Sequence, residues 1–271
     1  MSTYLSIKNA NVRDAFISFK EDGHIYTIHG VSGTYESTTT FIHHHFDVFD
    51  SKAVLNGMFA KESRLTGVQN PLRLTYNETY MNMTREEIEA SWEINRDDSA
   101  RRGTKMHYDI ECYSNGETVT NDSIEFQYFL NFRKDYPDLT PYRTEWMVYY
   151  EEYKICGSID MVYKTPDGSF EIYDWKRSKE IVWTKGNFAK FSHTKEIQHI
   201  ENVNFWHYSL QLNTYRKILE EKYQIDGTPI RISGMYLVVC HPNASNYQRI
   251  AVADVRTEVD ALFEARKQKI A

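Results

Sequence analysis

Two apolar segments separated by a short turn constrain the fold of this chain more than any other feature. Residues 155–163 and 169–175 are rich in apolar and β-branched side chains, and Thr165-Pro-Asp-Gly168 between them has the composition of a turn. The pattern predicts a β-hairpin. Because side chains alternate between the two faces of a strand, the spacing of charged residues within the hairpin predicts which of them lie together.

Three charged residues lie inside these apolar strands. Asp174 and Lys176 are two positions apart and share one face, which Asp160 on the adjacent strand can reach. Carboxylate oxygens are the ligands that Mg²⁺ prefers, together with substrate phosphates, and an ammonium group stabilises charge that develops on a phosphate. The arrangement indicates metal-dependent phosphodiester hydrolysis. Two solvated strand acids are the alternative, which fits less well because unpaired charge is costly in an apolar segment.

The composition allows one large domain, or one domain with an appended lobe, since 41% of the 271 residues are hydrophobic. No apolar run approaches the roughly 18–20 residues that a membrane span needs, and the N-terminus lacks the pattern of a secretory signal. The three cysteines are too scattered for a disulfide framework or a zinc site. We expect an intracellular protein that does not bind membranes.

The net charge of −6 argues against a protein that coats nucleic acid passively, because that class is usually basic. It is compatible with a nuclease, since a local basic groove can coexist with a negative total charge. In residues 176–195 cations alternate with aromatic side chains, which is typical of a track for a single nucleic-acid strand. An ordinary polar loop is the alternative. The residues that we assign to nucleic-acid contact in this segment are Arg177, Lys179, Trp183, Lys185 and Lys190.

The order of the predicted elements indicates an α/β protein. A hairpin that turns at Asp22-Gly23 comes first, and helices follow over much of the next hundred residues. Strands then dominate from residue 144. The expected helices are 37–49, 84–92, 98–113, 123–136, 205–223 and 257–269, and the expected strands beyond the hairpin are 144–150, 230–239 and 252–255.

Further candidate residues come from these elements. Glu145 begins the strand before Asp160 and supplies a third carboxylate, unless it is simply an exposed residue at a strand end. His107 lies on a predicted helix, where a single histidine is more often structural than a metal ligand. Gln211 and Tyr215, four residues apart, share one face of another helix. A glutamine on a helix is usually only a surface residue, and the alternative is that Gln211 forms a hydrogen bond with a catalytic water, a scissile phosphate or a base edge.

Five short motifs occur along the chain in one order: Gly103-Thr104-x-x-His107-x-x-x-Glu111, Glu145, Gly157-x-x-Asp160, Asp174-x-Lys176 and Gln211-x-x-x-Tyr215. In these motifs and in their order, the chain resembles the PD-(D/E)XK nuclease superfamily, and within it the RecB-like exonuclease branch. It is similar to mitochondrial genome maintenance exonucleases and their relatives in large DNA viruses and phages, above all in the phrase Asp-Trp-Lys-Arg-Ser-Lys. The motifs cover residues 103–215.

The resemblance implies a restriction-endonuclease-like core, with a mixed central sheet flanked by helices, in residues 101–271. Residues 1–100 would form the hairpin and a helical N-terminal lobe. The site would hold one or two Mg²⁺ or Mn²⁺ ions. Part of the branch carries an iron–sulfur cluster with four cysteine ligands, and three scattered cysteines predict none here.

The resemblance also implies a role for each site residue. Lys176 would position or activate the attacking water, and Glu145 would assist at the metal. Gln211 and Tyr215 would lie beside the scissile strand. The implied metal ligands are His107, Asp160, Asp174 and the main-chain carbonyl of Trp175.

The expected function is that of a metal-dependent exonuclease that hydrolyses DNA from single-stranded ends. DNA, preferably single-stranded or with a free end, is the expected partner. A structure-specific endonuclease with the same site is one alternative. A catalytically silent DNA-binding or recombination module is another, although such a module has no need of Asp160, Asp174 and Lys176.

Overall fold

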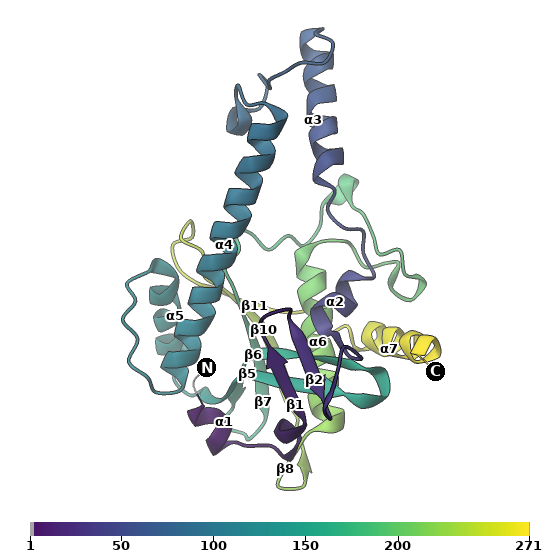
Figure 1. Ribbon diagram of the computed structural model, residues 1–271. Coiled ribbons are helices and arrows are strands. Elements are labelled where there is room, and N and C mark those ends of the chain that lie inside the picture. The colour runs from purple at the N-terminus through teal and green to yellow at the C-terminus, as the bar shows by residue number, and fades with distance from the viewer. Residues whose placement is uncertain (1–2, 271) are drawn as a thin grey trace. The chain divides into compact units, whose positions relative to one another are not determined.

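The computed structural model of the protein describes residues 3–270 (Figure 1). Within this range the chain forms two compact units. One unit combines the chain up to Asp47 with the chain from Lys105 onward, and the other is Val48–Thr104. The boundary that we predicted between residues 100 and 101 lies inside helix α4 (Arg85–Ser114), which is continuous from one unit into the other.

A mixed sheet forms the centre of the larger unit. Its strands run in the order β11-β10-β7-β6-β4, and β5 pairs with β6. The β4–β6 and β7–β10 pairs are parallel and the remaining pairs are antiparallel. The strands are β4 (Glu36–Ser37), β5 (Thr140–Tyr150), β6 (Ile155–Lys164), β7 (Phe170–Lys176), β10 (Ile232–Val239) and β11 (Gln248–Ala251).

One edge of β6 is interrupted where the candidate residues lie. β5 pairs along the length of β6, from Ile155 to Lys164. On the opposite edge, β4 pairs with Ile155 and Cys156, and β7 pairs only from Met161 onward. Within the described residues no strand therefore covers positions 157–160 on that edge, which leaves room for side chains to enter.

Helices cover both faces of the sheet (Figure 1). On one face α2 (Thr38–His43), α6 (Asn204–Lys222) and α7 (Arg256–Ile270) pack with Ile172 and Leu237. On the other face α5 (Ile124–Asp135) and the last turns of α4 pack with Tyr173 and Val238. Neighbouring residues of β7 and β10 thus pack into hydrophobic cores on opposite faces of the sheet, as expected for strands that are buried on both faces. The predicted α/β class, a mixed sheet flanked by helices, is confirmed.

The first strands form a smaller sheet in the same unit. β1 and β2 make the hairpin predicted at Asp22-Gly23, and Gly23 adopts a φ of +82° that favours glycine in the turn. The buried side of this sheet packs on Tyr149 and Cys156 of the central sheet. The sheet consists of β1 (Ile17–Lys20), β2 (Ile25–Ile28) and β3 (Val31–Ser32). Outside it the unit also contains α1 (Tyr4–Lys8), η1 (Val12–Phe16) and a separate two-stranded sheet of β8 (Gln224–Ile225) and β9 (Thr228–Pro229).

The unit Val48–Thr104 is helical and has a small core of its own. α3 (Ser51–Thr66) begins after Asp50, whose side chain accepts a hydrogen bond from the N–H of Ala53. A short 3₁₀ turn, η2 (Glu78–Tyr80), precedes the first turns of α4. The core side chains are Leu55, Phe59, Leu74 and Ile88. The remaining 3₁₀ turns, in the larger unit, are η3 (Glu151–Tyr153), η4 (Gly186–Phe188) and η5 (Lys195–Ile197).

Several predicted elements were wrong in their bounds, among them the strand predicted at 144–150, which begins at Thr140. The last strand is β11, because Gln248–Ala251 pairs with β10. Residues 252–255 lead from β11 into α7, and the N–H of Val252 still donates a hydrogen bond to the carbonyl oxygen of Met235 on β10. α2 ends at His43 rather than Phe49. The two helices expected at 84–92 and 98–113 are one, since nothing between them breaks a helix and Asp98 forms ion pairs with Arg101 and Arg102.

No helix among residues 3–270 is long and apolar enough to cross a membrane.

Candidate metal centre

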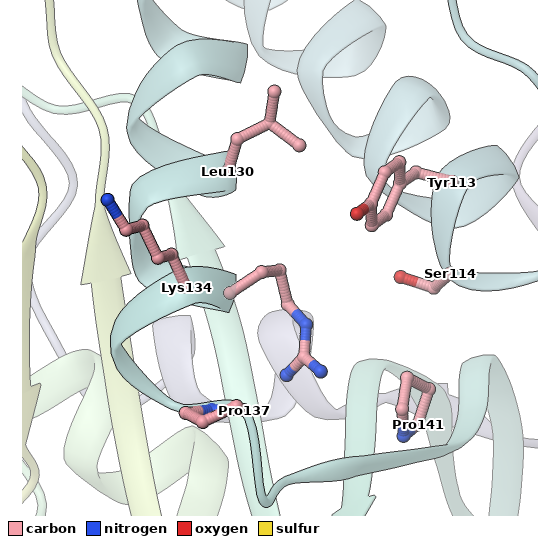
Figure 2. A pocket seen from close by; sticks show the side chains of 7 residues that line it. Tyr113, Ser114, Leu130, Lys134, Pro137 and Pro141 are labelled. Atoms are coloured by element: carbon pink, nitrogen blue, oxygen red, sulfur yellow. The ribbon is translucent and has the colours of Figure 1, made fainter.

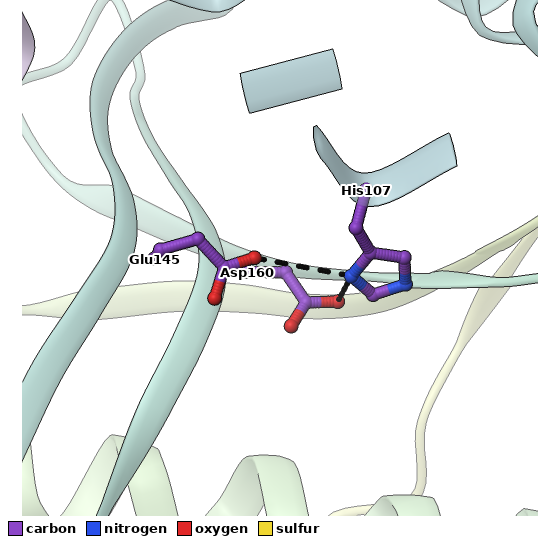
Figure 3. A group of neighbouring side chains, drawn as sticks. All are labelled: His107, Glu145 and Asp160. Carbon is purple, nitrogen blue, oxygen red and sulfur yellow. Dashed lines mark ion pairs between the residues drawn. The ribbon is translucent and has the colours of Figure 1, made fainter. Parts of the chain in front are cut away.

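His107, Glu145 and Asp160 converge at the interrupted edge of β6 (Figure 3). One potential ligand atom of each lies within 4.8 Å of the others. His107 Nδ1 is 3.5 Å from Asp160 Oδ2 and 3.9 Å from Glu145 Oε1. Within the described part of the chain this is the only group of three histidine, cysteine or carboxylate side chains with such spacing.

An unusual backbone conformation aims Glu145 at this point. Its φ is 42°, in the left-handed region where a residue other than glycine is strained, at a cost of about 1–3 kcal/mol. Pairing on both sides holds the residue there, since Thr144 pairs with Met161 and Trp146 with Ile159. Ser158 Oγ also donates a hydrogen bond of 2.9 Å to Glu145 Oε2. Strain of this kind, held by the surrounding sheet, is typical of functional sites.

Trp175 ties the histidine and the aspartate together through its main chain. Its N–H donates to Asp160 Oδ2 at 2.9 Å, and its carbonyl oxygen lies 2.9 Å from His107 Nε2. Because a carbonyl oxygen only accepts, Nε2 carries a proton, and it is Nδ1 that faces the two carboxylates. Once deprotonated, Nδ1 would offer its lone pair to a metal ion. A histidine that binds a metal commonly has its other ring nitrogen fixed in this way.

Burial and mutual charge shift the pKa values of the residues in this group. Burial lowers the pKa of His107, but the charges of Asp160 and Glu145 outweigh burial and raise that pKa to about 9. Burial raises the pKa of Asp160, and Glu145 adds to the rise while His107 opposes it. A divalent cation would relieve this repulsion. One imidazole nitrogen and two carboxylates therefore fit a divalent metal ion.

Asp174 and Lys176 form an adjacent pair rather than a part of the group of three. Lys176 Nζ lies 2.7 Å from Asp174 Oδ2 and 4.4 Å from the centre of the Tyr208 ring on α6. Burial raises the pKa of Asp174 to about 6, although Lys176 opposes the rise. Burial lowers the pKa of Lys176, but Asp174 and Asp160 outweigh it and raise the value, so the ammonium stays charged.

Two of the predicted metal ligands therefore have other partners. The carbonyl of Trp175 faces His107, and Asp174 holds Lys176. His107 and Asp160, which were predicted as metal ligands, lie in the group of three together with Glu145, which was predicted to assist.

Gln211 and Tyr215 lie together on α6, next to Gly157. Gln211 Nε2 is 3.4 Å from Tyr215 Oη and 3.5 Å from Thr39 Oγ1. A Cβ atom on Gly157 would lie 2.8 Å from the Tyr215 ring, so only glycine allows this approach. Tyr215 is 4% exposed, and its ring is not open to stacking by a base.

The basic segment after β7 divides into a buried and an exposed part. Arg177 Nε pairs with Glu125 Oε1 at 2.6 Å, with both side chains about nine-tenths buried, so we no longer assign Arg177 to nucleic-acid contact. Trp183 is half exposed and stacks on Phe205, with ring centres 3.7 Å apart. Three of the cations that we assigned to nucleic-acid contact are exposed: Lys179, Lys185 and Lys190.

Sequence reasoning missed several neighbours of the site. Ser158 precedes Asp160 by two residues on the same strand, a spacing that was available as a signal. Tyr208 and Thr39 reach the site only through the packing of α6 and α2.

A cavity of about 500 Å³ lies away from these residues, between α5, the end of α4 and the start of β5 (Figure 2). Tyr113, Ser114, Leu130, Lys134, Pro137 and Pro141 are among the residues that line it. No predicted site residue does so.

Comparisons with known proteins add little. No family model and no curated protein matches the chain. A solved structure described as the crystal structure of SSO0001 overlaps 82% of this chain and 87% of its own, with 12% sequence identity and a TM-score of 0.27. A similarity that weak carries no argument about fold family or function.

Proposed function

We propose that the protein is a Mg²⁺- or Mn²⁺-dependent deoxyribonuclease of the PD-(D/E)XK type that acts as an exonuclease on single-stranded DNA ends. The observation that carries the proposal is the convergence of His107, Glu145 and Asp160, with the Asp174–Lys176 pair beside them. The five motifs found in the sequence support the same family.

Each residue of the site has a task in phosphodiester hydrolysis. His107, Glu145 and Asp160 hold the ion, which when bound stabilises charge on the phosphate and favours deprotonation of water. Asp174 keeps the ammonium of Lys176 in place. Lys176 orients the attacking water or stabilises the negative charge of the transition state. Gln211 reaches the phosphate from α6.

The exposed part of the basic segment supports single-stranded DNA as the substrate. Lys179, Lys185 and Lys190 are free to contact phosphates, and Trp183 offers one ring face for stacking. Phe188 and Phe191 are also exposed, at 85% and 50%. Aromatic side chains between cations favour single strands because unpaired bases can stack.

Two DNA substrates test the proposal and separate it from its alternatives. The protein is incubated with Mg²⁺ or Mn²⁺ and either an end-labelled linear single strand or a closed single-stranded circle. We expect degradation of the linear strand and survival of the circle. Cleavage of the circle would instead establish an endonuclease. Binding without cleavage of either substrate would contradict the enzyme and favour a silent DNA-binding module.

A further inference from the structure

A cavity of about 390 Å³ lies between the β1–β2 hairpin and the start of α2. Its volume falls within the roughly 300–1,000 Å³ typical of small-molecule sites. Two tyrosines from separate segments, Tyr26 and Tyr35, line it together with His24. On another side the lining residues are Ser37 and Thr40, which carry hydroxyl groups. We call this cavity the tyrosine pocket.

The two tyrosine rings are held from behind by the central sheet. Both pack against the cluster of Ile17, Ile28, Tyr149 and Cys156, and Tyr35 meets the Tyr149 ring edge-on with centres 6.3 Å apart. The rings are half-buried, so each has a fixed side and a side open to a ligand. Rigid aromatic faces bind planar ligands at low cost in conformational entropy.

Among the described residues that line the pocket, the one carboxylate is Glu36, and it is paired with basic side chains. Glu36, which also lines it, forms a contact with Arg266 and an ion pair of 2.7 Å with His44 Nδ1. Lys154 Nζ lies 5.0 Å from the centre of the Tyr35 ring. The lining thus combines aromatic faces, hydroxyl groups and a nearby cation, which suit a nucleobase with its attached phosphate.

Two series of contacts connect the pocket with the residues around the candidate metal centre. Thr39, between Ser37 and Thr40, has its Oγ1 3.5 Å from Gln211 Nε2. Tyr26 packs on Cys156, two residues before Ser158, which in turn donates to Glu145. The charge of Glu145 also contributes, after burial and Cys156, to a raised pKa of Tyr26. A strand with a phosphate at the metal centre therefore has the pocket within reach of a neighbouring nucleotide.

We propose that the tyrosine pocket holds one unpaired base of the DNA strand, next to the phosphodiester bond at His107, Glu145 and Asp160. This inference rests on the proposed function and adds a substrate requirement to it. A base that stacks on Tyr35 or Tyr26 must be unpaired, so duplex ends would first have to open by at least one pair.

A fluorescent base placed at successive positions tests the proposal. Single-stranded oligonucleotides, each with one 2-aminopurine, are bound to the Asp174→Asn variant in Mg²⁺, and quenching is recorded for each position. We expect strong quenching at one or two adjacent positions. When Tyr35→Leu is combined with Asp174→Asn, this quenching should be lost and the affinity for the oligonucleotide should fall about tenfold. Tyr35→Phe should keep both.

The control is Tyr4→Leu, since Tyr4 is 56% exposed on α1 and lines no part of the pocket. Thermal unfolding of each variant shows whether Tyr35→Leu still folds. If it does not, Tyr26→Leu serves as the test variant, and we expect it to lose the position-specific quenching. Equal fluorescence at all positions, or quenching that survives both leucine variants, would overturn the inference. If the inference is overturned but the wild-type protein still cleaves linear DNA, the proposed function is not contradicted. A protein that neither binds nor cleaves DNA contradicts both.

Discussion

His107 and Trp175, 68 residues apart, are joined by a hydrogen bond of 2.9 Å between Nε2 and the main-chain carbonyl oxygen. The bond fixes which ring nitrogen of His107 faces Asp160 and Glu145. It also connects α4 to the strand that carries Asp174 and Lys176. The candidate metal centre is therefore assembled from a helix and three strands, and its geometry depends on their packing.

Metal binding should be visible as stabilisation. A ligand at a hundred times its dissociation constant stabilises the native state by about 2.7 kcal/mol. We expect MnCl₂ to raise the Tm of the wild-type protein, and to raise it much less in His107→Gln and Asp160→Asn. Calorimetry with and without the metal measures this. His199→Gln is the matched control, since His199 is 59% exposed and pairs only with Glu258 at the surface.

Removal of the ammonium should affect turnover more than binding. Lys176→Met leaves the three metal-binding side chains in place but deletes the charge 2.7 Å from Asp174 Oδ2. The loss of one preorganised electrostatic contact typically costs about 10²–10³ in kcat. We expect kcat to fall by about that factor with little change in KM, while Lys185→Met raises KM instead. A near wild-type kcat in Lys176→Met would exclude the assigned role.

A methyl group on Gly157 should disturb the neighbourhood of Tyr215. The new Cβ would lie 2.8 Å from the ring and 2.9 Å from Oη, so the tyrosine has to move. Overpacking of this kind costs about 1–3 kcal/mol. Urea unfolding should show that loss for Gly157→Ala, with slower DNA cleavage. Gly57→Ala, in α3 with nothing within 4 Å, should instead be neutral or stabilising.

Acid should destabilise the protein through a buried histidine outside the metal centre. Burial, with a smaller contribution from His43, lowers the pKa of His207 to about 4, and its Nε2 is buried without a partner. As the pH falls below about 6.5, His207 is protonated in the unfolded chain but stays neutral in the folded chain until about pH 4. The free energy of unfolding therefore decreases as the pH falls from about 6.5 to 4, by at most about 3 kcal/mol.

His207→Phe tests this, because it keeps the ring that packs on Phe46 with centres 4.2 Å apart and removes the titration. Its stability should change less over that pH window than that of the wild-type protein. An identical slope in both proteins would exclude His207 as the cause.

The sequence predicted the parts of the site that depend on local patterns. Alternation in a hairpin was enough to bring Asp174 and Lys176 to one face, because side-chain direction in a strand is fixed by parity. It could not give the left-handed conformation of Glu145, which depends on pairing with β6. It also could not show that Trp175 presents its carbonyl to His107, or that Arg177 is buried against Glu125, since both depend on helices distant in sequence.

Prediction of the fold was likewise limited to features that depend on local sequence patterns. The two hairpins and the helices α5, α6 and α7 followed from turn residues and periodicity, although α4 was predicted as two helices. The parallel pairs β4–β6 and β7–β10, by contrast, join segments far apart in the chain. Those pairs leave the interrupted edge at residues 157–160.

The most direct measurement of the central claim is the position of a Mn²⁺ ion in crystals soaked with the metal and a short single strand, located by its anomalous scattering. We predict a peak about 2.0–2.5 Å from His107 Nδ1 and from carboxylate oxygens of Glu145 and Asp160, with a phosphate of the strand beside it. A peak elsewhere in the molecule, or no peak at this group under conditions where the strand is cleaved, would contradict the account.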